Sequence, residues 1–173
     1  NLSQLPQTPS VKQDLVVPSL PVATPSIVSP VDGSATATFK TPKNLLEVYP
    51  ATKEENEEYQ AAFALMRASK YDDSITAFEE FLENHPSSSL ASNASYWAGE
   101  GHLINKDYSK ALASFNLVTD RYPNSSKVPD AMLRAADTLT SLKKVEDARV
   151  LYQNVMDNYP ESRAAKSAAK RIK

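Results

Sequence analysis

Two histidines and an acidic run are the residues in this sequence with the chemistry most suited to a reactive site. His85 and His102 could serve as general bases or metal ligands, and the run EENEEY at 54–59 could bind a cation. The chain has no cysteine, which excludes thiolate catalysis and cysteine-bound zinc. Whether any of these groups forms a site depends on the elements that hold them.

Those elements follow from a repeat of 37 residues that begins near Glu54. Proline recurs at Pro86, Pro123 and Pro160, each time after a histidine or tyrosine. A fixed period of this length is typical of a solenoid built from stacked helical units. The same shift superposes three further columns, two of small residues and one of aromatics: Ala62, Gly99 and Ala136; Ser74, Ala111 and Ala148; Phe78, Phe115 and Tyr152.

The repeat is typical of two antiparallel helices per copy. A small residue in each helix lets the partner helix approach closely, and the aromatic residue fills the space between hairpins. Proline ends the second helix because it biases the preceding residue away from helical geometry, and the following Ser or Asn can cap the next helix. Pro129 fits a first helical turn. We predict helices over residues 54–69, 72–84, 88–104, 109–121, 125–142, 145–158 and 162–172.

The predicted fold is therefore an all-α solenoid of three helical hairpins with a C-terminal capping helix. The repeats cover about residues 55–86, 92–123 and 129–160, and the cap covers 162–172. The cap segment is rich in Ala, Lys and Arg, which suits a helix with one solvated face.

In this frame the reactive groups have structural explanations. His85 aligns with Tyr122 and Tyr159, and His102 stands in a column of leucines, so we expect both to pack. Acidic residues in a first helical turn interact favourably with the helix dipole. The glycines cannot form a phosphate loop because two of the three lie within a helix with no strand before them. We assign no catalytic, cofactor-binding or metal-binding residue.

Composition narrows the partners. Lys and Arg total 19 against 21 Asp and Glu, so the net charge is -2 and gives no positive field that would attract nucleic acid. No apolar stretch is long enough to insert into a membrane. We expect a protein partner.

Proline marks the domain boundary, since eight of the 12 prolines fall within the first 50 residues. Residues 1–53 are predicted to be a Pro/Ser/Thr-rich extended linker, largely disordered, and residues 54–173 the helical domain. The alternative is that a short apolar piece such as 45–49 docks on the helical domain. The chain begins with Asn1 rather than Met, so we expect an upstream part, such as a signal peptide, to have been removed.

The repeats resemble those of the tetratricopeptide (TPR) family. In the middle copy, Gly99, Tyr108, Ala111, Phe115 and Pro123 stand where that family places its signature residues. The family period is 34 residues, so each copy here carries three extra residues, which we place around the turn between repeats and the start of the next helix.

Repeats lengthened in this way resemble the C-terminal domain of the Tol-Pal-associated cell division coordinator family, CpoB or YbgF. The matching text is NASYWAGE at 93–100, YPNSSKVPDAMLRAADTL at 122–139 and NYPESRAAKSAAKRI at 158–172. The resemblance implies a periplasmic adaptor of Gram-negative bacteria that binds the envelope protein TolA and a peptidoglycan synthase, coordinating wall synthesis with outer-membrane constriction. It also implies homo-oligomers through an upstream coiled coil, which this chain lacks. The alternatives are a TPR assembly factor for outer-membrane proteins and a generic protein-binding scaffold.

The TPR resemblance implies a binding groove lined by the first helix of each repeat. Aromatic and Arg side chains are frequent binding anchors, so we expect the groove to hold an amphipathic helix or an extended peptide. The alternative is that the aromatics pack between hairpins. Three acidic residues in the set predict a basic or mixed partner segment. The groove residues are Asn56, Tyr59, Phe63, Arg67, Asn93, Tyr96, Trp97, Glu100, Asp130, Arg134 and Asp137.

Overall fold

The computed structural model describes residues 46–172, and the rest of the predicted linker, residues 1–45, lies outside the described residues. The described part is all-α apart from one isolated backbone bridge. None of its helices is long and apolar enough to cross a membrane. The helices are α1 (Lys53–Arg67), α2 (Tyr71–Asn84), α3 (Ala91–Ile104), α4 (Tyr108–Arg121), α5 (Val128–Ser141), α6 (Val145–Asn158) and α7 (Arg163–Arg171).

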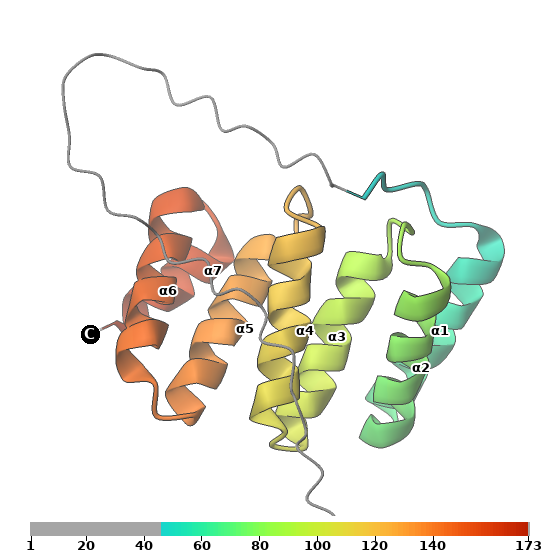
Figure 1. Ribbon diagram of the computed structural model, residues 1–173, viewed down its shortest axis with the longest axis horizontal. Helices are drawn as coiled ribbons and strands as arrows, with labels where there is room; N and C mark the ends of the chain where they lie inside the picture. Colours follow the sequence, from blue (N-terminus) through green and yellow to red (C-terminus); the bar gives the residue numbers. More distant parts are fainter. Residues whose placement is uncertain (1–45, 173) are drawn as a thin grey trace, which may run out of the picture. The chain divides into compact units, whose positions relative to one another are not determined.

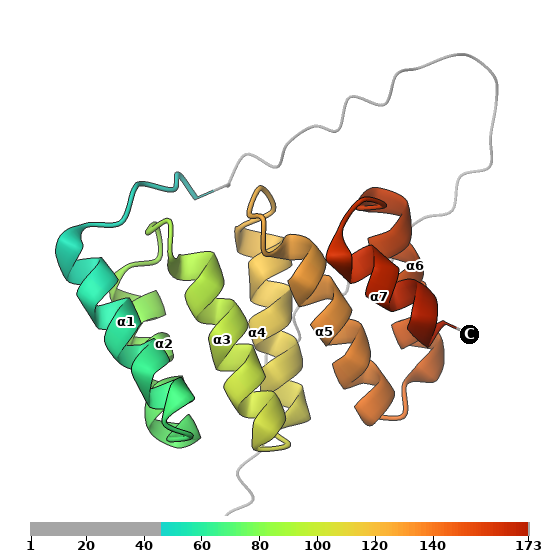
Figure 2. The ribbon, with the colours of Figure 1, turned by 180° about the vertical axis from the view of Figure 1, so that it is seen from behind.

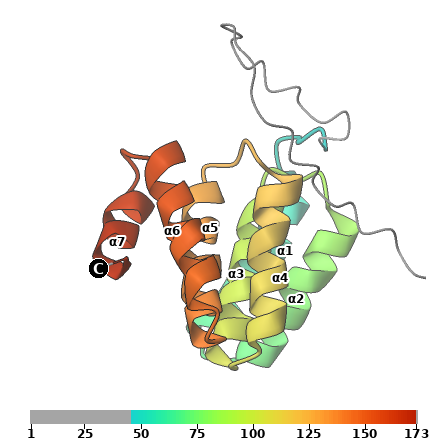
Figure 3. The ribbon, with the colours of Figure 1, turned by 60° about the vertical axis from the view of Figure 1, so that its left-hand side comes forward.

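The helices form two layers, as predicted for a solenoid of hairpins. The second helices of the hairpins, α2, α4 and α6, lie in front in Figure 1, and the first helices, α1, α3 and α5, lie in front in Figure 2. Each helix packs against the next one along the chain, and α7 packs on both α5 and α6. Figure 3 shows α7 beyond α6 at the end of the stack, where the predicted cap belongs.

The repeated small residues explain how closely the layers pack. Ala62 and Ala111 are fully buried, and the Ser74 hydroxyl donates to the Ala62 carbonyl oxygen at 2.9 Å. A Cβ atom on Gly99 would lie 2.7 Å from the ring of Phe115, so only glycine lets α3 lie this close to that ring. The small and aromatic columns of the repeat are therefore the contacts between helices.

Two first helices begin three residues later than predicted. Residues 86–90, here the first loop, and residues 123–127, here the second loop, form turns before α3 and α5. In both loops a serine N–H donates to the carbonyl of the residue before proline: Ser88 to His85 at 3.1 Å, and Ser125 to Tyr122 at 2.8 Å. Because these bonds pair the serine N–H groups within the loops, the helices begin only after the loops. The three extra residues of each repeat therefore belong to the loops.

The turn within each hairpin depends on a left-handed residue. Ser69, Lys106 and Lys143 have φ angles of 59°, 64° and 64°, and they recur at the repeat period. The next N–H donates back across the helix end, as from Lys70 to the Leu65 carbonyl at 3.0 Å. This is the pattern of a Schellman cap, in which glycine is usual because it lacks the Cβ that disfavours positive φ.

Replacing Lys143 with glycine is therefore expected to stabilise the domain by about 1 kcal/mol, because the left-handed conformation costs a residue with a Cβ roughly this amount. Urea unfolding followed by circular dichroism would measure it. Lys143→Ala is the matched control, since it removes the same charge but keeps the Cβ. An equal gain in both variants would show that charge, not backbone strain, is responsible.

Residues 46–51 lie against the first loop, as the docking alternative proposed. The Tyr49 N–H donates to the Ser87 carbonyl and the Ser89 N–H donates to the Tyr49 carbonyl, both at 2.8 Å, which forms a parallel bridge. Thr52 then caps α1 in a capping box with Glu55. The last residues of the predicted linker are thus part of the helical domain.

Candidate interaction surface

The predicted groove residues lie on α1, α3 and α5, whose surface is called here the first-helix face (Figure 2). Its aromatic half is formed by Phe63, Tyr96 and Trp97. The Phe63 and Trp97 ring centroids are 4.9 Å apart, and Tyr96 meets Trp97 edge to face at 5.5 Å. All three side chains are half-buried, so each is held by packing and still presents surface. Rigid, partly exposed aromatics of this kind are typical binding anchors.

Tyr59 differs from the other predicted aromatics because it belongs to the core. It is 8% exposed, and its ring packs against Phe78 and Phe81 at centroid distances of 5.6 and 6.1 Å. Its ring stacks on Phe63 at 6.4 Å. Tyr59 therefore packs beneath the exposed surface of Phe63 and has almost no accessible surface of its own. This matches the alternative that the aromatic residues pack between hairpins.

Tyr96 connects the aromatic half of the face with the charged half. The Tyr96 hydroxyl is protonated at neutral pH, as tyrosine ordinarily is, and burial and then the negative charge of Glu100 raise its pKa further. The Lys127 ammonium lies 5.1 Å from the ring centroid of Tyr96, within cation–π range. A partner thus meets a neutral phenol at this position.

The charged half of the face is an ion-pair network centred on Arg134. Arg134 makes a two-pronged ion pair with Glu100, including an Nη2–Oε2 hydrogen bond of 2.6 Å, and its Nη1 lies 3.4 Å from Asp137. Asp137 also accepts from the Tyr152 hydroxyl at 2.7 Å and pairs with Arg171 of α7 at 2.6 Å. The pKa of the Arg134 guanidinium is raised, mainly by the hydrogen bonds to Glu100.

This network changes the expectation of an acidic groove. Glu100 and Asp137 are paired with arginines, and Asp130 lies 3.9 Å from the Lys127 ammonium. The sequence analysis expected a basic or mixed partner segment from these three acids and did not find the pairs Glu100–Arg134 and Asp137–Arg171, because each joins residues 34 positions apart. Paired charges largely cancel at a distance, so these ion pairs leave the charged half of the face with little net charge.

The remaining predicted residues lie at the edges of the face. Asn56 is exposed, and its side-chain amide donates to the Thr52 carbonyl at 2.7 Å, which ties it to the start of α1. Arg67 is exposed in the last turn of α1, and Asn93 is half-buried near the start of α3. These three residues lie on α1 and α3, the helices that also carry the aromatic half of the face.

The two histidines pack and also pair with glutamates. His102 is 3% exposed with its Nε2 atom 3.1 Å from Glu79, and His85 lies 2.9 Å from Glu58 while packing on the Phe81 ring. Sequence reasoning missed these glutamates because they are 23 and 27 residues away. Across residues 46–172, no three His, Cys, Asp or Glu side chains are grouped as metal ligands.

Comparison with known families and relatives agrees with this architecture. Two tetratricopeptide-repeat family models match residues 59–126 and 130–162, which together make up more than half of the chain. The cell division coordinator CpoB of Pseudomonas putida is 43% identical over 49 residues, and that of Escherichia coli K12 is 44% identical over 46 residues. These segments cover 28% and 26% of this chain and 18% of each relative, so the chain matches only a small part of their length.

Solved structures show the same fold at low identity. The TPR2B domain of yeast Sti1 in complex with pHsp70 has a TM-score of 0.60 at 13% identity, covering 70% of this chain and 94% of that one. The Arabidopsis OM64 TPR domain has a TM-score of 0.57 at 14% identity, covering 68% and 93%. The matched repeat models agree with the three helical hairpins and the capping helix of the structure. The chain therefore belongs to the tetratricopeptide-repeat family, and its repeat domain is similar to that of CpoB.

Proposed function

We propose that this protein is a periplasmic adaptor, not an enzyme, whose first-helix face binds an envelope protein of TolA type. In this role it coordinates wall synthesis with outer-membrane constriction during division, and a peptidoglycan synthase is its second partner. TPR domains are protein-binding modules, and the similarity to cell division coordinators supports this choice of partners.

The observation that carries the proposal is the contact between Phe63 and Trp97 across two repeats. These rings lie on α1 and α3, are half-buried, and rest on the buried Tyr59 and on Tyr96. Such a platform gives a partner's apolar side chains a rigid surface at little entropic cost. Next to it, the Glu100–Arg134 pair offers polar groups whose positions are already fixed.

The expected partner segment is therefore an amphipathic helix or extended peptide with both apolar and polar side chains. Its apolar side chains would cover Phe63 and Trp97, and its polar side chains would meet the edge of the ion-pair network. Because that network is internally neutral, the affinity is expected to depend more on buried apolar area than on salt concentration.

Trp97→Ala tests the proposal. If Trp97 is a central anchor, its truncation should weaken binding of the purified periplasmic part of a TolA partner about 30-fold, corresponding to about 2 kcal/mol for a hot-spot residue. Isothermal titration calorimetry would measure the affinity, and circular dichroism would confirm that the variant folds. Trp97→Phe, which keeps a ring in contact with Phe63, should retain most of the affinity.

The matched control is Val150→Ala on α6, in the other helix layer, because Val150 is 62% exposed. It should bind as the unchanged protein does. A folded Trp97→Ala variant with unaltered affinity would exclude the first-helix face as the TolA site. Binding of unfolded outer-membrane protein segments in place of TolA would favour the assembly-factor alternative.

A further inference from the structure

The first loop binds an extended segment of the chain through three backbone-directed hydrogen bonds. Two join Tyr49 to Ser87 and Ser89, and the third runs from the Ala51 N–H to the Ser89 hydroxyl oxygen at 3.0 Å. The loop therefore acts as the edge of a short strand. The segment around Tyr49, which has no regular secondary structure, pairs with this edge in parallel.

The second loop presents the same edge one repeat later. By the 37-residue period, Asn124 corresponds to Ser87, Ser125 to Ser88, and Ser126 to Ser89, so the hydroxyl that accepts the third bond is kept. Among residues 46–172, neither the Asn124 carbonyl nor the Ser126 N–H or hydroxyl has a hydrogen-bond partner, and both residues are exposed. Within residues 46–172, the second-loop groups equivalent to those that hold Tyr49 and Ala51 at the first loop are thus unpaired.

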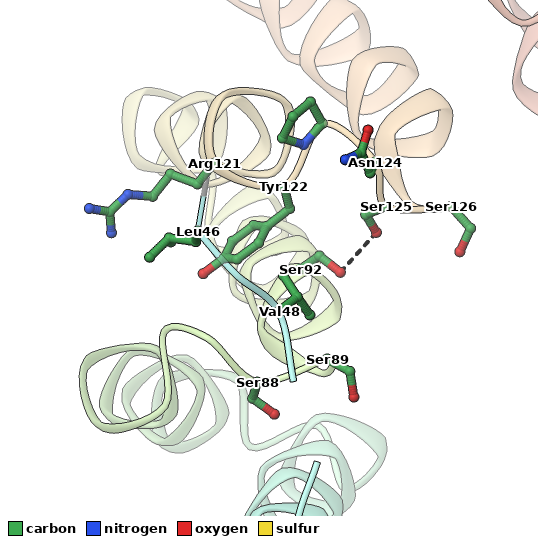
Figure 4. Close-up of a pocket in the computed structure, with 11 residues that line it drawn as sticks. Leu46, Val48, Ser88, Ser89, Ser92, Arg121, Tyr122, Asn124, Ser125 and Ser126 are labelled. Atoms are coloured by element: carbon green, nitrogen blue, oxygen red, sulfur yellow. Dashed lines mark hydrogen bonds between the residues drawn. The ribbon is translucent and has the colours of Figure 1, made fainter. Parts of the chain in front are cut away.

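A pocket of about 280 Å³ lies beside the second loop. The pocket is lined by residues of the segment before α1, the first loop, α3, the end of α4 and the second loop. Figure 4 shows this pocket, with the dashed line marking the 2.8 Å hydrogen bond from Ser125 to Ser92. Its lining combines serine and asparagine side chains with apolar groups and one arginine: Leu46, Val48, Ser88, Ser89, Ser92, Arg121, Tyr122, Pro123, Asn124, Ser125 and Ser126.

The walls of the pocket indicate what it would accept. Leu46, Val48 and Tyr122 supply apolar surface, and Tyr122 is fixed because its hydroxyl donates to the Pro86 carbonyl at 2.9 Å. Arg121 is exposed beside the pocket and makes no ion pair within residues 46–172, whereas Lys127 is paired with Asp130. A strand with apolar side chains and an acidic residue therefore matches both the surface and the charge.

We propose that the second loop is a separate binding site for an extended, acidic and apolar peptide segment of a partner protein. One residue of that segment donates its N–H to the Asn124 carbonyl and accepts from the Ser126 N–H, and the N–H two residues later donates to the Ser126 hydroxyl. The expected ligand resembles the chain's own segment 46–51, which in the structure is hydrogen-bonded to the first loop. This site uses none of the aromatic anchors of the first-helix face.

The test uses the whole chain and a blocked synthetic peptide, LEVYPA, which copies residues 46–51. Titration into the isotope-labelled protein, followed by amide NMR, should shift the Ser126 and Lys127 amides most. Ser126→Ala, which removes only the hydroxyl contact, should weaken peptide binding about fivefold, in line with one hydrogen bond of about 1 kcal/mol. Ser126→Pro, which also removes the N–H, should abolish it.

Controls separate this site from its alternatives. Ser87→Ala, the same type of change at a first-loop residue that does not line the pocket, should leave peptide binding at the second loop unchanged. Trp97→Ala should also leave it unchanged, so this proposal can fail independently of the proposed function. Shifts that appear only at Ser87–Ser89 would mean that the peptide merely replaces the chain's own segment, and no saturable shift would mean that the second loop is not a site. Either result overturns the proposal. Ser126→Ala keeps the test valid if the proline variant fails to fold.

Discussion

Replacing Phe115 with alanine is expected to lower the free energy of unfolding by about 4 kcal/mol, the range for truncating a fully buried phenylalanine. Phe115 is 0% exposed in the central repeat, where its ring meets the backbone of Gly99 and lies 5.7 Å from the Tyr96 ring. Its loss leaves a cavity that α3 and α4 cannot close without moving relative to each other. Because small domains are only marginally stable, this loss is a large fraction of the total stability, and the variant should melt at a clearly lower temperature.

Urea unfolding monitored by circular dichroism gives the measurement. Val150→Ala is the matched control, since it also shortens an apolar side chain but at an exposed position, and it should change stability by less than about 0.5 kcal/mol. Phe115→Leu should fall between the two, because leucine refills part of the cavity. A loss below about 1.5 kcal/mol for Phe115→Ala would mean that the central hairpins can repack around the missing ring.

The second large effect is expected from Ala168→Glu in the capping helix. Ala168 is 0% exposed and lies in the cluster that α7 forms with Leu133, Tyr152 and Val155. A glutamate there would place an unpaired carboxylate among apolar groups, so α7 should detach instead of burying it. The expected loss is about 3 kcal/mol, in the upper part of the usual range for single substitutions.

Hydrogen exchange would localise the effect. The amides of α6 and α7 should lose protection while those of α1 and α2 keep most of theirs, because each repeat depends mainly on its neighbours. Lys166→Glu, on the exposed side of the same helix, introduces the same residue as a control and should leave exchange nearly unchanged. If exchange accelerates equally in all helices, the domain unfolds as one unit and α7 is not a local cap.

Detachment of α7 would also alter the first-helix face. The Arg171 side chain of α7 pairs with Asp137, which also accepts from Tyr152 and lies next to Arg134. Without Arg171, the charged half of the face would carry an excess negative charge. The cap therefore determines the electrostatics of the predicted binding surface as well as its stability.

The sequence alone determined the features that depend on local chemistry and on the repeat period. Three recurring features specified the seven helices, their pairing into hairpins and the cap, because each contact recurs at a fixed spacing. These features are the proline and serine at the ends of repeats, the small residues at Ala62, Gly99 and Ala136, and the aromatic column. The sequence also placed Phe63 and Trp97 on the same face, since the two residues occupy first helices of adjacent repeats.

Tertiary structure alone decided which side chains are paired and which are accessible. Glu100 and Arg134 are 34 residues apart, in different columns, and their ion pair exists only because α3 and α5 lie in the same helix layer (Figure 2). In the same way, Tyr59 and Tyr96 share a column, yet Tyr59 is buried by Phe78 and Phe81 while Tyr96 is half-exposed. A repeat period fixes the position of a residue along its helix, but its burial and charge balance depend on non-equivalent neighbours from other helices, which no column of the repeat records.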